Sequence, residues 1–556
     1  VELVGGVVSA RRGAGRNERA PLPAIYGESL VLVYRILFLL FAEARGLVPL
    51  WHPVYRESYS IEALRDAAEM PGQHTGAWET LLAISRLAHA GCDAGTLHVT
   101  PFNGRLFAPA RTALAEASDL DDEAASRALV ALSTDRRAKG VGRVRVDYRD
   151  LGVEQLGAVY ETVLDYDPVL LGPEGVETPG VDGGGRVNEP RANAERRATV
   201  RSSLPAIGLR GGSGRRKASG SFYTPSPVTD YLVRRTLHPL VAGRAPEEIL
   251  ELRVLDPAMG SGAFLVAACR YIAGAYESAL VSDGRCHPAE IDEAERASFR
   301  RTVAERCLFG VDVNPMAVEL ARLSIWLTTL SADRQLTLLD HHLVSGDSLV
   351  GASIADLLRR PPGNGGRRGP RAPLPLFAPE DLDSDLREVV PARLRIASEP
   401  ADTVAAVKEK ERALAELDRP AAPHARWKRA LDLWCAGWFW PATSTPPETR
   451  TFVALVDEAL GRHRSLPAHT AARLLEQAEN IAASRRFFHW HLEFPEAFFE
   501  VDGSAAEDAG FDAVLTNPPW DMLRADEGQA EADRDAGRAL VKFVHESGVY
   551  RSQSSG

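Results

Sequence analysis

The chain has 556 residues, 45% of them hydrophobic, which exceeds one ordinary hydrophobic core and provides enough apolar surface for two or three domains. A formal net charge of −11 excludes a general electrostatic attraction to DNA or acidic membranes, so a polyanionic partner would have to meet a local basic surface. The five cysteines are widely spaced and include no CxxC pair, which is typical of a reducing compartment and favours a cytoplasmic protein.

The first segments along the chain predict helices. Residues 1–20 begin with valine rather than methionine and lead us to expect a disordered or truncated start. Residues 21–182 are mostly helical in period, with Gly, Pro or Asp between the periodic segments, and predict an N-terminal helical domain. Its most apolar stretch, residues 30–42, contains Arg35 and is shorter than the roughly 20 residues of a membrane-spanning helix, so we expect a buried helix and no membrane partner.

Residues 183–218 differ in composition from the helical domain, because they are rich in Gly and Arg and nearly free of acidic residues. Their weak apolar periodicity favours a flexible, solvated linker. The arginines leave contact with phosphate groups as the alternative interpretation.

After this segment, short apolar runs alternate with helical patterns that begin at Ala263 and Pro315. Such alternation predicts an α/β fold with a parallel, doubly wound sheet. Residues 219–350 supply three of its strands, in "LRVLDPA", "CLFGVDVN" and "HHLVSGDSL", and residues 505–556 supply the fourth, in "FDAVLTNPPW". Residues 351–504 lie between them and predict a helical insertion, because a loop of that length is anomalous in a compact sheet.

The first predicted strand ends in "DPAMGSGAFL", where Gly260 and Gly262 allow a tight turn and a close approach to a ligand. A dinucleotide-binding fingerprint would require a third glycine where Leu265 stands, and the Gly-Lys-Ser/Thr of a phosphate-binding P-loop is absent. Both patterns for binding a nucleotide through its phosphates are therefore disfavoured.

Three acids end the first three predicted strands: Asp256, Asp312 and Asp347. Ligands of doubly wound sheets bind at these carboxyl ends. Each aspartate alone is equally well explained as a helix N-cap, but three in succession beside a glycine turn favour a ligand site. A ligand with an amino group, a ribose and an adenine amine but no phosphate suits acids without basic partners, and S-adenosyl-L-methionine is the cofactor that we predict.

The fourth predicted strand ends in "TNPPW". Pro518 and Pro519 cannot donate to a sheet, so the carbonyl of Pro518 is left as an acceptor, and the side-chain oxygen of Asn517 is a second one. Two acceptors suit an aromatic NH2 group that gains positive charge while attacking a sulfonium methyl, and Trp520 offers a stacking surface for a base swung out of a duplex. The alternative is an ordinary turn with a buried tryptophan.

With these residues, the chain resembles the DNA adenine-N6 methyltransferases, especially those of type IIG restriction-modification systems and of the BREX and DISARM phage-defence systems. The resemblance rests on "SGSFYTPSPVTDYLV", "VLDPAMGSGAFL", "LFGVDVNPMAVELARLSIWL", "SGDSL", "FHWHLEFPEAF" and "TNPPW". It implies catalytic roles for Asn517, Pro518, Pro519 and Trp520, which would hold the target adenine. It implies cofactor binding by Tyr223, Thr224, Pro225, Asp256, Pro257, Ala258, Gly260, Gly262, Asp312, Val313 and Asp347.

The resemblance also implies a Rossmann-like methyltransferase sheet of the gamma arrangement, with double-stranded DNA and other defence-system subunits as partners. Of the seven strands typical of the family, four can be placed, in the expected spatial order three, two, one, four. The sheet is thus expected to be incomplete in this chain, with the target-recognition domain following it. No metal site is expected, because "HWH", "HH" and "CH" lack companion ligands at useful spacing.

Two other functions remain open at this point. An Asn-Pro-Pro-aromatic motif serves any planar NH2 acceptor, so methylation of a protein glutamine or of an RNA amine is one alternative. A non-catalytic cofactor-binding fragment is the other, because the expected sheet is unfinished.

Overall fold

The structure is a computed structural model that describes residues 2–13, 22–70, 76–101, 105–118, 120–135, 143–149, 152, 157, 166–170, 207–211, 224–329, 339–358, 389–396, 403–441, 443–518 and 531–550. The chain divides into two compact units. The first unit comprises Val1–Leu151, Val159–Ala218 and Ala332–Gln335, and the second comprises Gly152–Ala158, Ser219–Ser331 and Leu336–Gly556.

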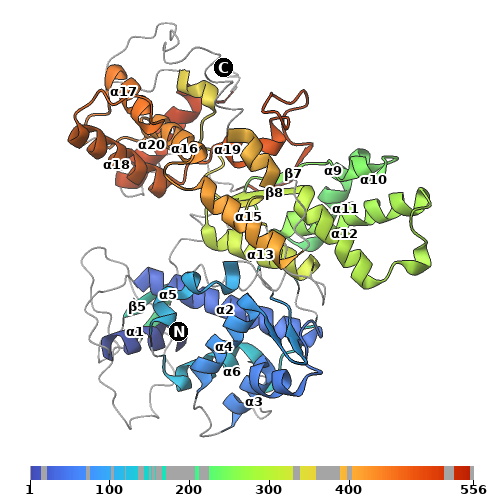
Figure 1. The fold of residues 1–556 in the computed structure, drawn as a ribbon. Helices are drawn as coiled ribbons and strands as arrows, with labels where there is room; N and C mark the ends of the chain where they lie inside the picture. Colours follow the sequence, from blue (N-terminus) through green and yellow to red (C-terminus); the bar gives the residue numbers. More distant parts are fainter. Residues whose placement is uncertain are drawn as a thin grey trace. The chain divides into compact units, whose positions relative to one another are not determined.

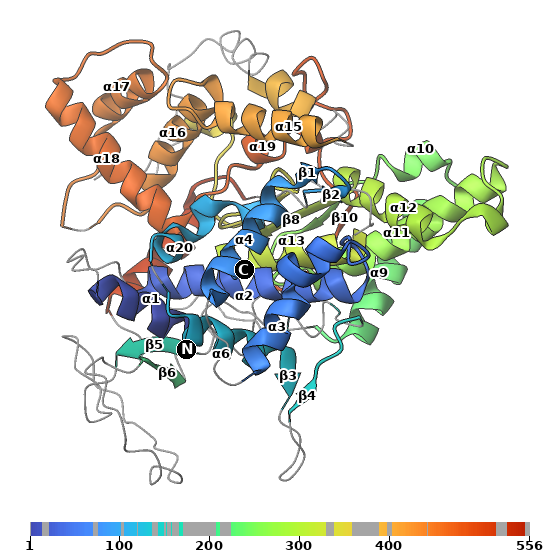
Figure 2. The same ribbon diagram turned by 60° about the horizontal axis from the view of Figure 1, so that its bottom comes forward.

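The first unit is mainly helical and is built around a long apolar helix, α2 (Leu22–Ala44), which α1, α3, α5 and α6 contact (Figure 2). The other helices are α1 (Glu2–Gly13), α3 (Ile61–Glu69), α4 (Ala77–Ala90), α5 (Ala113–Glu116) and α6 (Asp122–Ser133). Short antiparallel pairs join β1 (Cys92–Ala94) to β2 (Leu97–Val99), β3 (Thr134–Asp135) to β4 (Val144–Arg145) and β5 (Tyr166–Leu170) to β6 (Ile207–Gly211).

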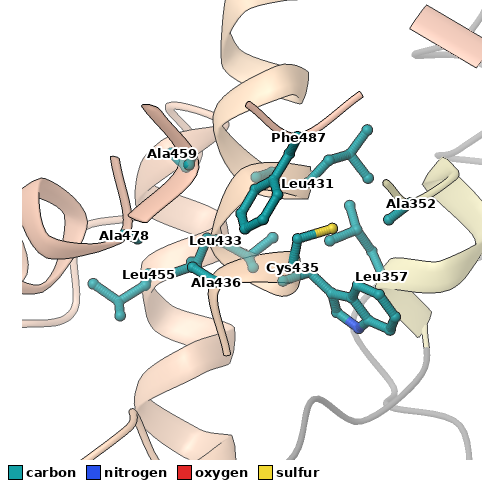
Figure 3. Packing of buried hydrophobic residues seen from close by; sticks show 14 of the residues in the cluster. Ala352, Leu357, Leu431, Leu433, Cys435, Ala436, Leu455, Ala459, Ala478 and Phe487 are labelled. Carbon is teal, nitrogen blue, oxygen red and sulfur yellow. The ribbon is translucent and has the colours of Figure 1, made fainter. Parts of the chain in front are cut away.

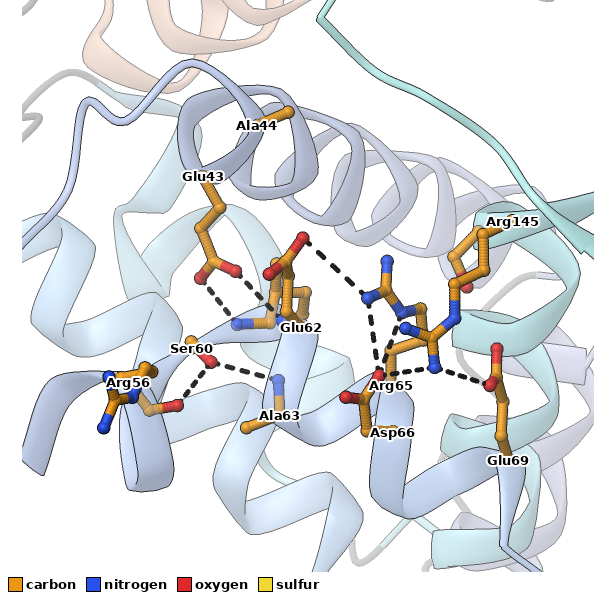
Figure 4. Close-up of polar contacts among 12 residues, drawn as sticks. Glu43, Ala44, Arg56, Ser60, Glu62, Ala63, Arg65, Asp66, Glu69 and Arg145 are labelled. Carbon is orange, nitrogen blue, oxygen red and sulfur yellow. Dashed lines mark hydrogen bonds and ion pairs between the residues drawn. The ribbon is translucent and has the colours of Figure 1, made fainter. Parts of the chain in front are cut away.

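Charged side chains on α2 satisfy backbone groups of its neighbours. Arg35 is fully buried and donates to the carbonyls of Leu106 and Ala108, each at 2.8 Å. Glu43 accepts from the N–H groups of Ile61 and Glu62 at 2.6 and 3.0 Å, at the start of α3 (Figure 4). Helix N-terminal N–H groups lack intrahelical partners, so this carboxylate fixes the position of α3 against α2.

The structure adds elements to two segments of the first unit for which we expected none. Residues 1–20, expected to be a disordered or truncated start, contain α1, where Leu3, Val4 and Val7 are buried. Gly6 lowers the helix propensity but allows close packing, since a Cβ there would lie 2.5 Å from Leu120 Cδ1. The expected linker, residues 183–218, contains β6, while its residues 183–206 and 212–218 lie outside the described residues.

Two helices of the structure, α2 and α11 (Ala263–Ser282), are long and apolar enough to cross a membrane. The most apolar window is 67% buried within the protein for α2 and 50% buried for α11. Core helices of globular proteins share this length and composition, so these two helices are weak evidence for membrane insertion.

The second unit contains a four-stranded parallel sheet of β7 (Val254–Asp256), β8 (Leu308–Asp312), β9 (Leu343–Ser345) and β10 (Ala513–Val514). The strand order is β10-β7-β8-β9, which is three, two, one, four in order of appearance and is the order that we expected. Helices α11 and α13 (Pro315–Thr329) begin at the predicted residues, and α12 (Glu293–Arg306) precedes β8. The parallel α/β sheet is thus confirmed.

The two faces of the sheet are covered differently. Gly310 faces α11, because a Cβ there would lie 2.8 Å from Leu265 Cδ1. Its neighbours Phe309 and Val311 point to the other face, where they pack with Phe488 and Phe494. The segment that precedes β10 therefore closes the face opposite α11.

A separate hydrophobic core lies in the predicted helical insertion (Figure 3). The helices of the insertion are α15 (Val404–Leu417), α16 (Pro423–Ala436), α17 (Thr449–Ala459), α18 (Ala468–Arg485) and the short α19 (Trp490–Glu493). The later helix α20 (Glu531–Glu546) belongs to this core (Figure 1), since Phe543 packs in an edge-to-face arrangement against Trp434 of α16 and against Trp438. Residues 505–556 are predicted to belong to the sheet domain, whereas Phe543 of α20 packs in the core of the insertion.

Candidate functional site

The end of β7 carries a buried acid and a glycine turn. Asp256 is 1% exposed, and its Oδ1 accepts from the N–H of Ala258 at 3.1 Å. Gly260 and Gly262 have φ angles of +52° and +83°, which favour glycine, and a Cβ on Gly262 would approach the Cα of Ala321 to 3.2 Å. The glycines therefore allow both the turn and the close packing of α11 on α13.

The end of β8 is tied to this turn by Asp312. Its Oδ2 accepts from the N–H of Gly260 at 2.9 Å, and its Oδ1 accepts from the N–H of Asn314 at 2.8 Å. Each carboxylate oxygen has two lone pairs, so these two bonds leave Asp312 able to accept from hydroxyl groups of a ligand. Val313, the next residue, is 45% exposed.

The end of β9 repeats the pattern with Asp347. Its Oδ1 accepts from the N–H of Leu349 at 3.0 Å, and the N–H of Gly346 donates to the carbonyl of Asp312 at 2.9 Å. The structure thus brings the three predicted acids to the carboxyl ends of three adjacent strands, each oriented by an amide two residues further along the chain.

Burial dominates the electrostatics of the three acids. It raises the pKa of Asp256 to about 7, assisted by the charge of Asp312 and opposed by the hydrogen bond from Ala258. Burial also raises the pKa of Asp312, while its backbone hydrogen bonds and the Arg486 guanidinium lower it. For Asp347, burial raises the pKa against the hydrogen bond from Leu349 and the charge of Arg485.

Asn517 lies just after the end of β10 and contacts Thr224, near the start of the segment that begins at Ser219. Leu515 donates its N–H to the carbonyl of Leu255 at 2.8 Å, so the chain after β10 leaves the sheet beside Asp256. The Nδ2 group of Asn517 donates to the hydroxyl of Thr224 at 3.2 Å. Thr224 precedes α9 (Ser226–Val241), and this contact joins two predicted site residues that are 293 positions apart.

The predicted site residues do not all lie within the described part of the chain. Pro225 and Pro518 are exposed, and Pro257 and Ala258 are half-buried between β7 and the glycine turn. Tyr223, Pro519 and Trp520 lie outside the described residues, so their roles stay predictions.

Sequence reasoning missed three side chains at the strand ends. Arg486, after α18, donates to the carbonyl of Val313, and Arg485 acts on Asp347 through its charge. The hydroxyl of Tyr550, after α20, donates to the carbonyl of Leu349. The two arginines lie just before "FHWHLEFPEAF", one of the segments of the family resemblance, from which only Phe487 separates them, and that was the available signal.

The histidines of "HH" and "HWH" have packing and hydrogen-bonding roles. His342 lies against Phe309 with ring centroids 4.2 Å apart, and its Nε2 is 3.0 Å from Glu496 Oε1. His489 is fully buried, accepts from the N–H of Ala352 at Nδ1 and contacts Asp432 Oδ1 at 2.9 Å through Nε2. Among the described residues, no group of three or more His, Cys, Asp or Glu could hold a metal ion.

Two family models match the second unit of the chain. The N-6 DNA Methylase family matches residues 212–348. The Eco57I restriction-modification methylase family matches residues 306–542. Together the two matches span all four strands of the parallel sheet, the glycine turn, the three acids and Asn517.

Three curated relatives match shorter parts. A Methanocaldococcus jannaschii protein named as a type II restriction enzyme and methyltransferase is 24% identical over 181 residues, which are 24% of this chain and 15% of that protein. The adenine-specific methyltransferase PglX of Streptomyces coelicolor is 29% identical over 143 residues, 24% of this chain and 10% of that protein. An Escherichia coli type II restriction enzyme and methyltransferase is 23% identical over 139 residues, 23% of this chain and 14% of that protein.

Among solved structures, the type IIL restriction-modification enzyme MmeI in complex with DNA matches with a TM-score of 0.31 and 15% identity. This match covers 63% of the present chain and 40% of the MmeI chain. The matches to the curated relatives cover 10–15% of those proteins.

Proposed function

We propose that this chain, which matches two DNA methylase families through residues 212–542, is a DNA adenine-N6 methyltransferase that transfers a methyl group from S-adenosyl-L-methionine to N6 of an adenine in double-stranded DNA. The observation that carries the proposal is the contact of Asn517 with Thr224, beside the strand that ends in Asp256. A role in restriction-modification or phage defence is part of the same proposal and is supported by the relatives' names. Other defence subunits as partners stay a prediction of the family resemblance.

The donor set fits this cofactor. Asp256, Asp312 and Asp347 end three adjacent parallel strands, and a carboxylate accepts hydrogen bonds from hydroxyl, ammonium and amine groups alike. We assign the ribose to Asp312, the adenine amine to Asp347 and the methionine end to Asp256 with Thr224, Pro225 and the glycine turn. The bound cofactor supplies an electrophilic methyl group on a positively charged sulfur.

Asn517 would act on the acceptor amine. Because its Nδ2 donates to Thr224, the amide is oriented by a residue of the proposed cofactor site. Its Oδ1 and the carbonyl of Pro518 would accept the two protons of the adenine amine and stabilise the positive charge that develops on that nitrogen. Thr224 thereby links the position of the acceptor to that of the cofactor.

The target adenine would have to leave the duplex, because N6 cannot approach a cofactor from within the base stack. Stacking on the predicted Trp520 would offset about 1 to 3 kcal/mol of the cost of unstacking.

The net charge of −11 means that DNA would have to be held by local basic surfaces or by other parts of the protein. We place the reaction in the cytoplasm, consistent with five cysteines that are all unpaired.

The test uses the full-length protein, radiolabelled S-adenosyl-L-methionine and duplex DNA that lacks adenine methylation. Asn517→Ala should reduce methyl transfer by at least about 100-fold, the usual loss when a transition-state hydrogen bond is removed, and should leave cofactor affinity within a few-fold. Unchanged methylation by this variant would contradict the proposal.

Parallel assays with ribosomal RNA and with a glutamine-containing protein acceptor distinguish the alternative substrates, because an Asn-Pro-Pro motif accepts any planar amine. Methylation of RNA or protein but not of DNA would identify one of them. Calorimetry with residues 1–556 tests the remaining alternative: cofactor binding without methyl transfer is the result expected of a non-catalytic fragment. The predicted division into an N-terminal helical domain, a methyltransferase sheet and a helical insertion belongs to the proposal.

A further inference from the structure

The helical insertion returns to the sheet directly beside the third strand end. The N–H of Asp347 donates to the carbonyl of Arg486 at 2.7 Å, and the N–H of Phe488 donates to the carbonyl of Val350 at 2.8 Å. Asp347 and Phe487 form a parallel bridge. Residues 486–488 therefore extend the sheet edge beyond β9.

Two glycines of "SGDSLVG" make this close approach possible. A Cβ at Gly346 would lie 2.5 Å from Phe488 Cδ2, and a Cβ at Gly351 would lie 1.8 Å from the carbonyl oxygen of Phe488. Neither distance is tolerated by a side chain. The insertion is thus docked onto the segment that contains Asp347.

Arg486 occupies a special position in this docked segment. It caps α18 with φ 57° and ψ 53°, a left-handed conformation, and it is the only residue other than glycine with positive φ in the described part of the chain. From there its guanidinium crosses to the second strand end and donates to the carbonyl of Val313. Its backbone accepts from Asp347, so this one residue joins the ends of β8 and β9.

We propose that Arg486 is a positioning residue of the cofactor site, which holds the Asp312–Val313 turn at its place beside Asp347 and so makes the helical insertion part of the cofactor-binding machinery. This inference rests on the proposed function. It assigns to the insertion a contribution to cofactor affinity that neither the strands nor the glycine turn can supply.

The charges around Asp312 support this role. Asp256 faces it from the end of β7, and Asp347 lies at the end of β9. Arg485, the last residue of α18, acts on Asp347 through its charge, and Arg486 acts on Asp312 from the insertion. The guanidinium of Arg486 lowers the pKa of Asp312 against the effect of burial, so it favours the ionised form that accepts hydroxyl groups.

The test is calorimetric titration of the chain with S-adenosyl-L-methionine at several pH values. Arg486→Gly is compatible with the left-handed backbone and removes the side chain with its guanidinium, so we expect about tenfold weaker binding, the loss of one charge-assisted hydrogen bond. The pH below which affinity falls should also move upward. Arg486→Lys should retain the wild-type pH profile, and Arg473→Ala, an exposed arginine of the same helix, should bind like the wild type.

The outcomes separate this inference from the proposed function. If wild type binds and Arg486→Gly has the same affinity and pH profile, the role of Arg486 is wrong while the function stands. If Gly and Lys variants lose affinity equally with no change in pH profile, Arg486 acts only through folding, which also overturns the inference. Absence of wild-type binding contradicts the proposed function itself. Arg486→Asn, which tolerates the same backbone conformation, replaces the glycine variant should that one unfold.

Discussion

Asp256 ends β7 with its carboxyl group almost entirely removed from water, and burial raises its pKa to about 7. A raised folded-state pKa means that the protonated form is favoured up to near neutral pH in the cofactor-free protein. A ligand that carries an ammonium and a sulfonium favours the ionised form instead. Binding of such a ligand should therefore release a proton.

We expect the affinity for S-adenosyl-L-methionine to rise as the pH increases from about 5 to about 7, where Asp256 ionises. Asp256→Asn should bind more weakly and lose the part of this slope that comes from Asp256, since its side chain does not titrate, while the part that Arg486 controls through Asp312 remains. Titration calorimetry in two buffers of different ionisation enthalpy measures both the affinity and the proton release. An equal slope in the wild type and the variant would show that another group is responsible.

The residues of the site were predictable to different degrees. The three acids could be read from the sequence, because each follows a short apolar run and parallel strands end at one edge. The contact of Asn517 with Thr224 could not, because it depends on the path of the chain across 293 positions. Arg486 escaped prediction for the same reason, since an arginine at the end of an amphipathic helix is ordinarily a solvated residue.

The docking of the helical insertion onto the segment after β9 depends on Gly351. Gly351→Ala would place a Cβ 1.8 Å from a backbone oxygen, so we expect it to lower the free energy of unfolding of the second unit by about 3 kcal/mol or more. Gly274→Ala is the matched control, because nothing lies within 4 Å of a Cβ at this helical position. It should be neutral or stabilise by about 0.5 to 1 kcal/mol. Urea-induced unfolding compares the two, and equal effects would contradict the close approach.

Helix α3 provides a second test, because Glu43 caps it from α2. Burial raises the pKa of Glu43 to about 8, against its two backbone hydrogen bonds. Since the folded-state pKa lies above the unfolded value of 4.5, the stabilisation from the protonated form is present at low pH and is lost as pH rises toward 8. The loss is on the order of 3 kcal/mol.

Glu43→Gln should abolish this pH dependence, because an amide does not titrate, while costing about 1 kcal/mol through the loss of one acceptor at the start of α3. Urea-induced unfolding at pH 5 and pH 8 measures both effects. If the variant keeps the wild-type difference between the two pH values, Glu43 is not the titrating group.

The helices and strands whose apolar residues repeat regularly or form short runs were predictable, and the others were not. All four strands of the parallel sheet and the starts of α11 and α13 follow from the apolar runs and the residues that precede them. Helix α1 was missed because Gly5 and Gly6 weaken its helical propensity, although they allow it to pack closely. Strand β6 was missed because its partner, β5, lies some forty positions earlier in the chain. No short turn joins the two strands, so the sequence does not mark them as a hairpin.

For the whole molecule, the sequence predicted a helical region followed by a parallel sheet with an insertion. The structure divides mainly between Ala218 and Ser219, while Gly152–Ala158 belong to the second unit and Ala332–Gln335 to the first. The strand order could be anticipated only from the family resemblance, because apolar runs carry no information about which strands are neighbours. The packing of α20 with the insertion was unpredictable for a similar reason. An apolar residue such as Phe543 can pack against any core, and the sequence does not show that its neighbours are Trp434 and Trp438.

The pairing of β10 with β7 also bears on when the edge of β7 can be covered during synthesis. Arg253 and Asp512 flank that pairing and are 259 positions apart, so the edge of β7 stays without this partner until the residues up to β10 have left the ribosome. Pairings of such sequence separation carry a high entropic cost of loop closure and form slowly. Most residues of the insertion's hydrophobic core precede β10 in the chain, so they can collapse first and shorten the effective distance between the two strands, before Phe543 completes that core. Asn517 is synthesised after the other three strands and the insertion, so a nascent chain could form the proposed cofactor site before it gains the residue proposed to act on the acceptor amine.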